Sequence, residues 1–178
     1  GKIEGTNFTE SLLIGHATTG TLNDAQKNTG VGIEALDALT SGDRNTAVGT
    51  GAGTSITGSS FNTMIGTNSM RASGGNRNTA LGNGSGIAVT GDYNILLGSE
   101  SGDNITSGDG NVIIGSVDAG SATGDRQLLI TGFDGTTTTT WISGDSSGNL
   151  TFAADVTLGD DLHLDSDAAV LKFGDDGE

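Results

Sequence analysis

The sequence has no cysteine and no proline, and only seven aromatic and seven basic residues among 178. The absence of cysteine excludes disulfide bonds as a source of stability. The basic residues are outnumbered by 22 acidic ones, so the net charge is −15. Nucleic-acid binding through a basic face is therefore excluded, because a polyanion would be repelled. No apolar run approaches the roughly 20 residues that a membrane-spanning helix needs, so membrane insertion is not expected.

Glycine is the residue in excess, with 32 copies, a share far above the usual value of about 7%. Hydrophobic residues make up only 33% of the chain, against roughly 45–50% in ordinary domains. Such a chain cannot build one wide core, and we expect a thin repetitive structure that shares its core with partners. The sequence starts without methionine and ends in an acidic run, so we expect a piece of a longer polypeptide.

An internal repeat runs through the first three quarters of the chain. Each copy opens with a polar residue, most often Asn, and has an aliphatic residue three positions later; Gly follows it in seven copies and Thr131 in the last. The spacing between copies is 17 or 16 residues. The copies start at Ser11, Asn28, Asn45, Asn62, Asn78, Asn94, Asn111 and Gln127.

Two columns of this repeat predict structure. The residue before the glycine is always aliphatic, and six of the eight are β-branched, which favours a buried strand position. These predicted core residues are Ile14, Val31, Val48, Ile65, Leu81, Leu97, Ile114 and Ile130. The glycines themselves are predicted to form corners, where a positive φ is needed. They are Gly15, Gly32, Gly49, Gly66, Gly82, Gly98 and Gly115.

A second hydrophobic column stands seven residues past the glycine, and a Gly/Asp/Ser turn cluster follows it. Each copy therefore predicts a strand, a glycine corner, a second strand and a turn. The predicted fold is all-β: a β-roll or β-solenoid with 16–17-residue coils stacked about 4.8 Å apart. Since two aliphatic columns make a meagre interior, we expect an intertwined or side-by-side homotrimer.

The period ends near residue 133, which predicts a division of the chain. We expect a leading segment (residues 1–10), seven full coils and a partial one (11–133), a Thr/Gly-rich link (134–148) and a second β-strand module (149–178). In this module apolar residues alternate from Leu150 to Leu158, which is typical of a half-buried strand. We expect the module to continue beyond Glu178.

Candidate sites are few. Asp161, His163, Asp165 and Asp167 alternate along the second module and are weak candidates for binding a divalent ion, a solvated strand face being the simpler interpretation. The glycine-rich runs lack the lysine and the helix of a phosphate-binding loop. With two histidines, no cysteine and short turns, the sequence predicts no catalytic residue and no cofactor.

Two further surfaces are worth weighing. One is a column of threonines beside the turn, which raises an ice-binding surface as an alternative; it comprises Thr40, Thr57, Thr90, Thr106 and Thr123. The other is a set of cationic and aromatic residues predicted to point outward, as contacts for neighbouring chains or a host glycan. They are Arg44, Phe61, Arg71, Arg77, Tyr93 and Arg126.

The repeat resembles a known class of proteins. Segments such as Asn45–Gly49, Asn62–Gly66 and Asn78–Gly82 look like the repeats of phage tail fibres, particularly marine ones, and are similar to the β-roll heads of trimeric autotransporter adhesins. The stretch from Gly148 to Asp175 resembles the acidic strand modules that follow such repeats in phage fibres. The 16–17-residue period differs from the shorter coil of the bacterial heads and favours the viral alternative.

The resemblance implies a non-enzymatic, homotrimeric fibre on a virion that mediates host attachment. The implied partners are further copies of this chain, other virion tail or fibre proteins, and a glycan or protein receptor on the host surface. A trimeric adhesin on an extracellular bacterial surface is the alternative, and an ice-binding solenoid is a more distant one.

Overall fold

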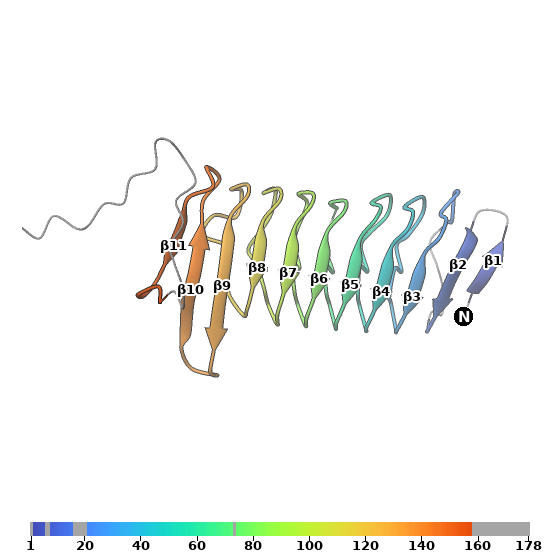
Figure 1. The fold of residues 1–178 in the computed structure, drawn as a ribbon. Helices are drawn as coiled ribbons and strands as arrows, with labels where there is room; N and C mark the ends of the chain where they lie inside the picture. The colour runs from blue at the N-terminus through green and yellow to red at the C-terminus, as the bar shows by residue number, and fades with distance from the viewer. Residues whose placement is uncertain (1, 6–7, 16–20, 73, 158–178) are drawn as a thin grey trace, which may run out of the picture.

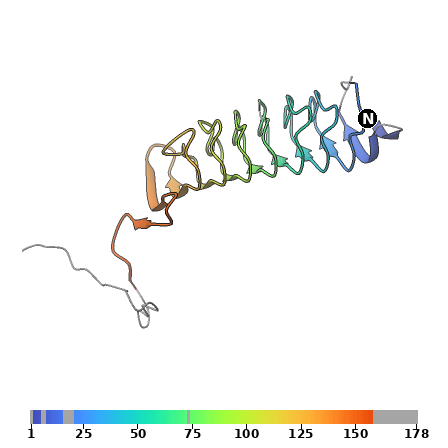
Figure 2. The ribbon, with the colours of Figure 1, turned by 90° about the horizontal axis from the view of Figure 1, so that it is seen from above.

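The computed structural model describes residues 2–5, 8–15, 21–72 and 74–157, and these form a single β-sheet beside a stack of coils (Figure 1). All eleven strands lie side by side in chain order. Viewed from above, the connecting segments of the coils stand on one side of the row of strands (Figure 2). The strands are β1 (Lys2–Gly5), β2 (Phe8–Ile14), β3 (Thr29–Val31), β4 (Thr46–Val48), β5 (Thr63–Ile65), β6 (Thr79–Leu81), β7 (Ile95–Leu97), β8 (Val112–Ile114), β9 (Leu128–Phe133), β10 (Thr138–Gly144) and β11 (Leu150–Phe152).

The parallel part of the sheet follows the sequence repeat. Strands β2 to β9 pair in parallel, and each residue pairs with the one a single repeat later, as in Thr46 with Thr63 and Thr63 with Thr79. The all-β solenoid predicted from the 16–17-residue period is therefore confirmed. The shorter coils lack one residue in the turn cluster that precedes the next Asn, so the strands keep their register.

The interior of the coils is narrow and is filled from two sides. The middle residue of each three-residue strand from β3 to β8 points inward and is buried, as Met64, Leu96 and Ile113 are. The column seven residues past the glycine faces it and is also buried, as predicted; its buried members are Leu22, Leu39, Ile56, Val89 and Ile105. Ser73, which shares this column, lies outside the described residues.

Large side chains and glycines fit together in this interior. A Cβ built on Gly53 would lie 2.8 Å from the sulfur of Met64, which belongs to the next coil. A Cβ on Gly86 or Gly102 would likewise collide with Leu96. Long side chains thus fill the space that glycines leave in the same or a neighbouring coil, which gives the close packing expected of a protein interior.

The predicted core column is wrong for the single chain. The aliphatic residues before the glycines occupy the third position of each strand and point away from the interior. Ile14, Val31, Val48, Ile65 and Leu81 are 37–47% exposed, and Leu97, Ile114 and Ile130 are half-buried. Side chains alternate along a strand, so the inward position belongs to the middle residue. That residue is Gly30 or Ala47 in two coils, and its hydrophobicity is therefore weaker than that of its outward neighbour.

The glycines that follow this column do lie at corners. Gly49 has a φ of 135°, a conformation that side-chain-bearing residues rarely adopt. A Cβ built on it would lie 2.5 Å from the carbonyl oxygen of Gly66, the equivalent corner of the next coil. The same two constraints apply to Gly32, so this column needs glycine both for its φ and for the close approach of stacked backbones.

The predicted second strand is absent among the described residues. After each corner the chain forms turns in which left-handed residues alternate, as at Asn68 and Met70. Backbone groups there bond partly within the coil and partly to the next one: Ile56 N donates to Gly53 O at 3.1 Å, and Gly53 N donates to Ser69 O at 3.0 Å. The back of the solenoid is therefore a stack of hydrogen-bonded turns.

Antiparallel strands close both ends. β1 pairs with β2 at one end, and β9, β10 and β11 form a meander at the other. The stretch 134–148 was expected to be a link, but it contains β10 of the same sheet. The Asp134 carboxylate accepts hydrogen bonds from Thr136 N and Thr137 N in the β9–β10 turn, and bonding from Thr137 and then Thr136 holds the pKa of Asp134 below its ordinary value. β11 covers three residues of the predicted second module, whose positions 158–178 lie outside the described residues.

Candidate interaction surface

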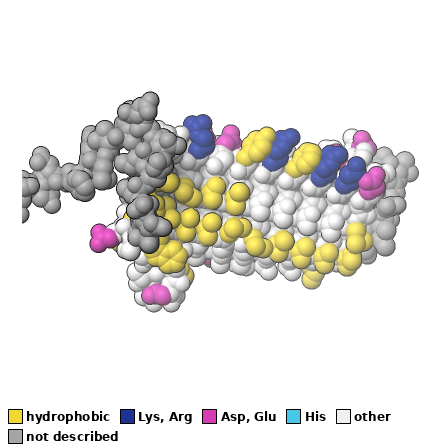
Figure 3. All heavy atoms as spheres, viewed as in Figure 1, with side chains coloured by type: hydrophobic (Ala, Val, Ile, Leu, Met, Phe, Trp, Pro, Cys, Tyr) yellow, Lys and Arg dark blue, Asp and Glu magenta, His cyan; other side chains and the backbone are white. Residues whose placement is uncertain are grey.

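The outward face of the parallel sheet is apolar and uncharged. In β3 to β6 it carries one threonine and one aliphatic residue per strand, as in Thr63 and Ile65. From β7 onward both outward positions are aliphatic, as in Ile95 and Leu97. Figure 3 shows the resulting row of apolar side chains along the rod and its doubling toward the C-terminal end. We call the outward residues of β2 to β9 the outer face.

The outer face continues onto the C-terminal meander. Ile130 of β9 pairs with Ile142 of β10, which pairs with Phe152 of β11, and directly paired residues share one face. The Trp141 ring lies over Gly132, where a Cβ would be 2.5 Å from the indole. Trp141 and Phe152 are 55% and 48% exposed. The apolar surface is thus widest, and richest in aromatic residues, at this end of the rod.

A column of cations and aromatic rings runs along one edge of the outer face. Its members immediately precede the repeat Asn, or Gln in the last copy, and all have positive φ. The Arg44 guanidinium lies 5.1 Å from the centre of the Phe61 ring, and Arg77 lies 5.1 Å from Phe61 and 5.4 Å from Tyr93. We call it the basic–aromatic column: Lys27, Arg44, Phe61, Arg77, Tyr93 and Arg126.

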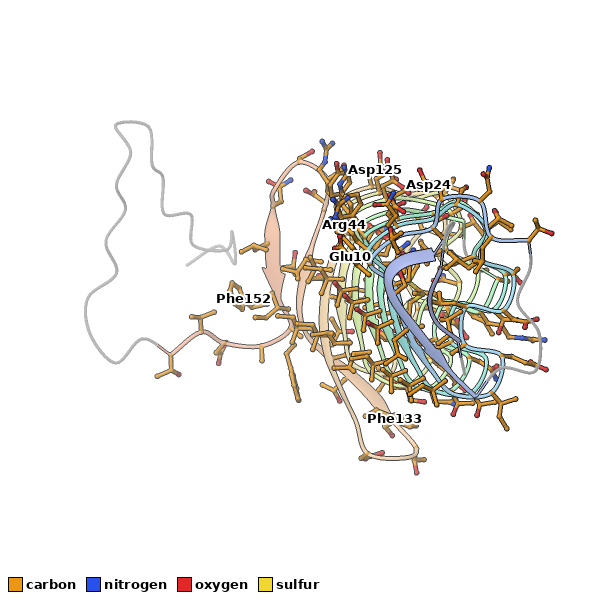
Figure 4. All side chains as sticks on the ribbon, turned by 90° about the vertical axis from the view of Figure 1, so that its right-hand side faces the viewer. Glu10, Asp24, Arg44, Asp125, Phe133 and Phe152 are labelled. Atoms are coloured by element: carbon orange, nitrogen blue, oxygen red, sulfur yellow. The ribbon has the colours of Figure 1, made fainter. Side chains whose placement is uncertain are left out.

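Charged residues from coils that are far apart in the sequence lie close to this column. Viewed along the rod, Glu10, Asp24, Arg44 and Asp125 lie at one corner of the stacked coils, while Phe152 lies on the side of the sheet away from the interior (Figure 4). Lys27 Nζ is 3.6 Å from a carboxylate oxygen of Glu10. Four of the seven basic residues of a strongly acidic chain belong to this single column. Arg71, the other described arginine, belongs to a different column, five residues past Gly66.

A buried ladder of asparagines stands between this column and the strands. The Asn62 amide nitrogen Nδ2 donates to Asn45 Oδ1 at 3.2 Å and to the Gly75 carbonyl at 3.0 Å, while Asn62 Oδ1 accepts from Asn78 N at 2.9 Å. Each other Asn of the series makes the equivalent bond to a neighbouring coil, and Gln127 ends the ladder on Asn111. No buried side-chain N or O atom of the described residues lacks a hydrogen-bond partner. The repeat Asn thus joins adjacent coils, a role that its place at the start of each copy did not reveal.

Three carboxylates meet in an open hollow of about 310 Å³ near the C-terminal coils, lined by Glu100, Asp103 and Asp118 together with Ser116 and Thr138. A side-chain hydrogen bond to Asp118, partial burial and the charges of Asp118 and Glu100 raise the pKa of Asp103 to about 6. Asp103 therefore holds a proton below this pH, and the cluster gains negative charge above it.

No family model, no curated protein and no solved structure matches the chain.

The predicted metal candidates Asp161, His163, Asp165 and Asp167 lie outside the described residues. Within the described part of the chain, no group of three or more His, Cys, Asp or Glu residues is arranged to hold a metal ion. No helix in that part is long and apolar enough to cross a membrane.

The threonine column proposed for ice binding lies beside the turns, and the hydroxyls of Thr40, Thr90 and Thr106 donate to carbonyls of the next coil. Thr90 Oγ1 donates to Thr106 O at 3.1 Å, and Thr106 Oγ1 donates to Ala122 O at 3.2 Å. A flat array of free hydroxyls is therefore not found in this column.

Proposed function

We propose that this chain is a structural segment of a homotrimeric fibre, a tail fibre of a virus that infects bacteria, which serves host attachment and carries out no catalysis. The observation that carries the proposal is the outer face: an uncharged surface on which an aliphatic column runs the length of the parallel sheet. The coils supply stiffness, because each one is bonded to its neighbours through backbone and asparagine ladders.

The size of the outer face supports a shared interface. Eight strands at about 4.8 Å spacing give a length of about 34 Å, and three residues per strand give a width of about 10 Å. The strip alone thus covers roughly 340 Å², and Trp141, Phe152 and the basic–aromatic column lie beyond it. The largest apolar patch on a typical monomer is about 300–600 Å² and is often functional, so the strip and its apolar extensions together are a candidate interaction site. The regular stacking favours identical chains aligned in parallel, because every coil then meets an equivalent coil.

Light scattering on the purified segment tests the proposal. We expect a mass of three times 17.6 kDa. Leu81→Asp places a charge on the outer face, where Leu81 is 46% exposed, and should give the monomer mass with an unchanged circular dichroism spectrum. Thr57→Asp, on the exposed turn side of the coils, is the matched control and should stay trimeric. A monomeric or dimeric wild-type segment would overturn the proposed trimer.

Two alternative functions are a bacterial surface adhesin and an ice-binding protein. A trimeric adhesin on a bacterial surface would use the same interface and would differ in the rest of its polypeptide. Ice binding is favoured by one different observation: Thr29, Thr46, Thr63 and Thr79 form a regular outward column on the flat sheet itself. That column covers four coils and is replaced by aliphatic residues from Ile95 onward. A monomer that lowers the freezing point of water below its melting point would support ice binding over the fibre.

A further inference from the structure

We infer that the basic–aromatic column of one chain docks against the corner-glycine edge of the next, so that three identical seams close the fibre. We define the corner edge as the residues one and two positions past each corner glycine: Ile33, Glu34, Thr50, Gly51, Thr67, Asn68, Asn83, Gly84, Ser99, Glu100, Ser116 and Val117. The inference rests on the proposed trimer and adds which surfaces meet. A threefold ring requires such an arrangement, because each chain offers one patch to its left neighbour and a different patch to its right neighbour.

The width of the sheet places these two edges at the seams. Packed sheets lie about 10 Å apart, so each outer face in a trimer would sit about 5 Å from the axis. A triangle with that inner radius has sides of about 17 Å, whereas a three-residue strand spans only about 10 Å. The chain therefore reaches the corners of the triangle with one or two residues on either side of the strand. In the coil of β7 those residues are Tyr93 and Asn94 on one side and Gly98 and Ser99 on the other.

Charge favours contact between unlike edges. The basic–aromatic column holds four cations, of which Lys27 is paired with Glu10 of its own chain. The described corner edge carries two exposed glutamates, Glu34 and Glu100, and no cation. Lys27 immediately precedes the coil that contains Glu34, and Arg44 is the last residue of that coil. A parallel neighbour at the same height thus presents Glu34 to the level of Lys27 and Arg44. Two basic–aromatic columns facing each other would instead bring like charges together.

The backbone conformation of the column also supports an interface. Its side-chain-bearing residues hold φ values of 52–64°, a region that is unfavourable for most residues other than glycine. Gly110 occupies the equivalent position in one coil, so glycine fits there. Large cations and aromatic rings nevertheless fill six positions of the column. Arginine, tyrosine and phenylalanine are enriched at protein interfaces, so their presence at positions that glycine would fit supports an interface along this column.

Cysteine cross-linking tests the seam, and every disulfide must come from the introduced residues because the chain has no cysteine of its own. Tyr93→Cys is combined in turn with Asn83→Cys, Ser99→Cys and Ser116→Cys, three successive positions of the corner edge. Within one chain Tyr93 and Ser99 are roughly 20 Å apart along the extended strand, far beyond the ~7 Å between Cα atoms that a disulfide allows. Any disulfide between these positions therefore joins two chains, and the three pairs cover an axial offset of one coil in either direction.

We expect at least one double variant to oxidise to a covalent trimer in a denaturing gel, while each single variant stays monomeric there. Covalent dimers from Tyr93→Cys alone would overturn the inference, because they require like edges to meet. Absence of cross-links in all three pairs would overturn it as well, if light scattering shows that the variants are trimers. A monomer mass in light scattering is the separate failure of the proposed function.

Discussion

The asparagine ladder gives the sharpest test of how the coils hold together. Asn62→Ala removes an amide that bonds to three groups in neighbouring segments. Asn45 Oδ1 keeps its bond from the backbone N of residue 62, at 3.0 Å. Asn78 N and the Gly75 carbonyl, both buried, lose the partners described above. Each unsatisfied buried group costs about 1–3 kcal/mol, so the variant should lose about 4 kcal/mol of unfolding free energy.

Urea unfolding followed by circular dichroism measures this loss at a fixed protein concentration. With a denaturant slope of about 2 kcal/mol per molar, the midpoint should fall by roughly 2 M. Asn23→Ala is the matched control: Asn23 is exposed, outside the ladder, and should change stability by less than about 0.5 kcal/mol. Equal midpoints for the two variants would refute the reasoning, since they would mean that the buried Asn does not join the coils.

Three other changes have definite expected outcomes. The folded-state pKa of Asp103 is raised to about 6, so its contribution to stability is present below pH 4 and is lost as the pH rises through 6. Asp103→Asn should abolish this fall of thermal stability with pH. After allowance for solvent screening, it should also stabilise the protein by about 1 kcal/mol at pH 7. Gly49→Ala forces a side chain onto a φ of 135° and against the next coil, so it should cost about 3 kcal/mol or more in urea unfolding; an unchanged midpoint would contradict the corner geometry. Arg77→Ala removes contacts with two aromatic rings and should cost about 1–2 kcal/mol in the same assay, whereas Arg71→Ala, outside the column, should cost less than about 0.5 kcal/mol.

The period of the repeat was sufficient to predict the solenoid. Because Asn, an aliphatic residue and Gly recur together every 16 or 17 residues, each strand is expected to pair with the equivalent strand of the next copy. The corner glycines were also recognisable, since a stacked corner excludes a side chain. The turns after each corner were not predictable in the same way, because Asn68 and Met70 adopt left-handed conformations that their residue types do not indicate. Bonds between neighbouring coils hold those conformations in place.

The candidate surface was partly visible in the sequence. The cations and aromatic rings before each Asn were predicted to point outward, but their alignment into one column appears only when the coils are stacked. Trp141 was assigned to the link of residues 134–148, because the run of threonines before it does not indicate a strand and β10 was therefore missed. Pairing of β10 with β9 is what brings Trp141 over Gly132 and joins it to the apolar face.

The error over the core column itself supports a shared interface. Hydrophobicity alone assigns Val31 and Val48 to the interior, yet the buried positions beside them are Gly30 and Ala47. A chain that functions alone gains about 1.5–3 kcal/mol from each large aliphatic residue that it buries, and gains little from one left in water. Here the β-branched residues stand outside a coil that is already fully packed with smaller ones. Such an arrangement is stabilising only if a further surface covers the outer face, and we propose that an identical chain provides it.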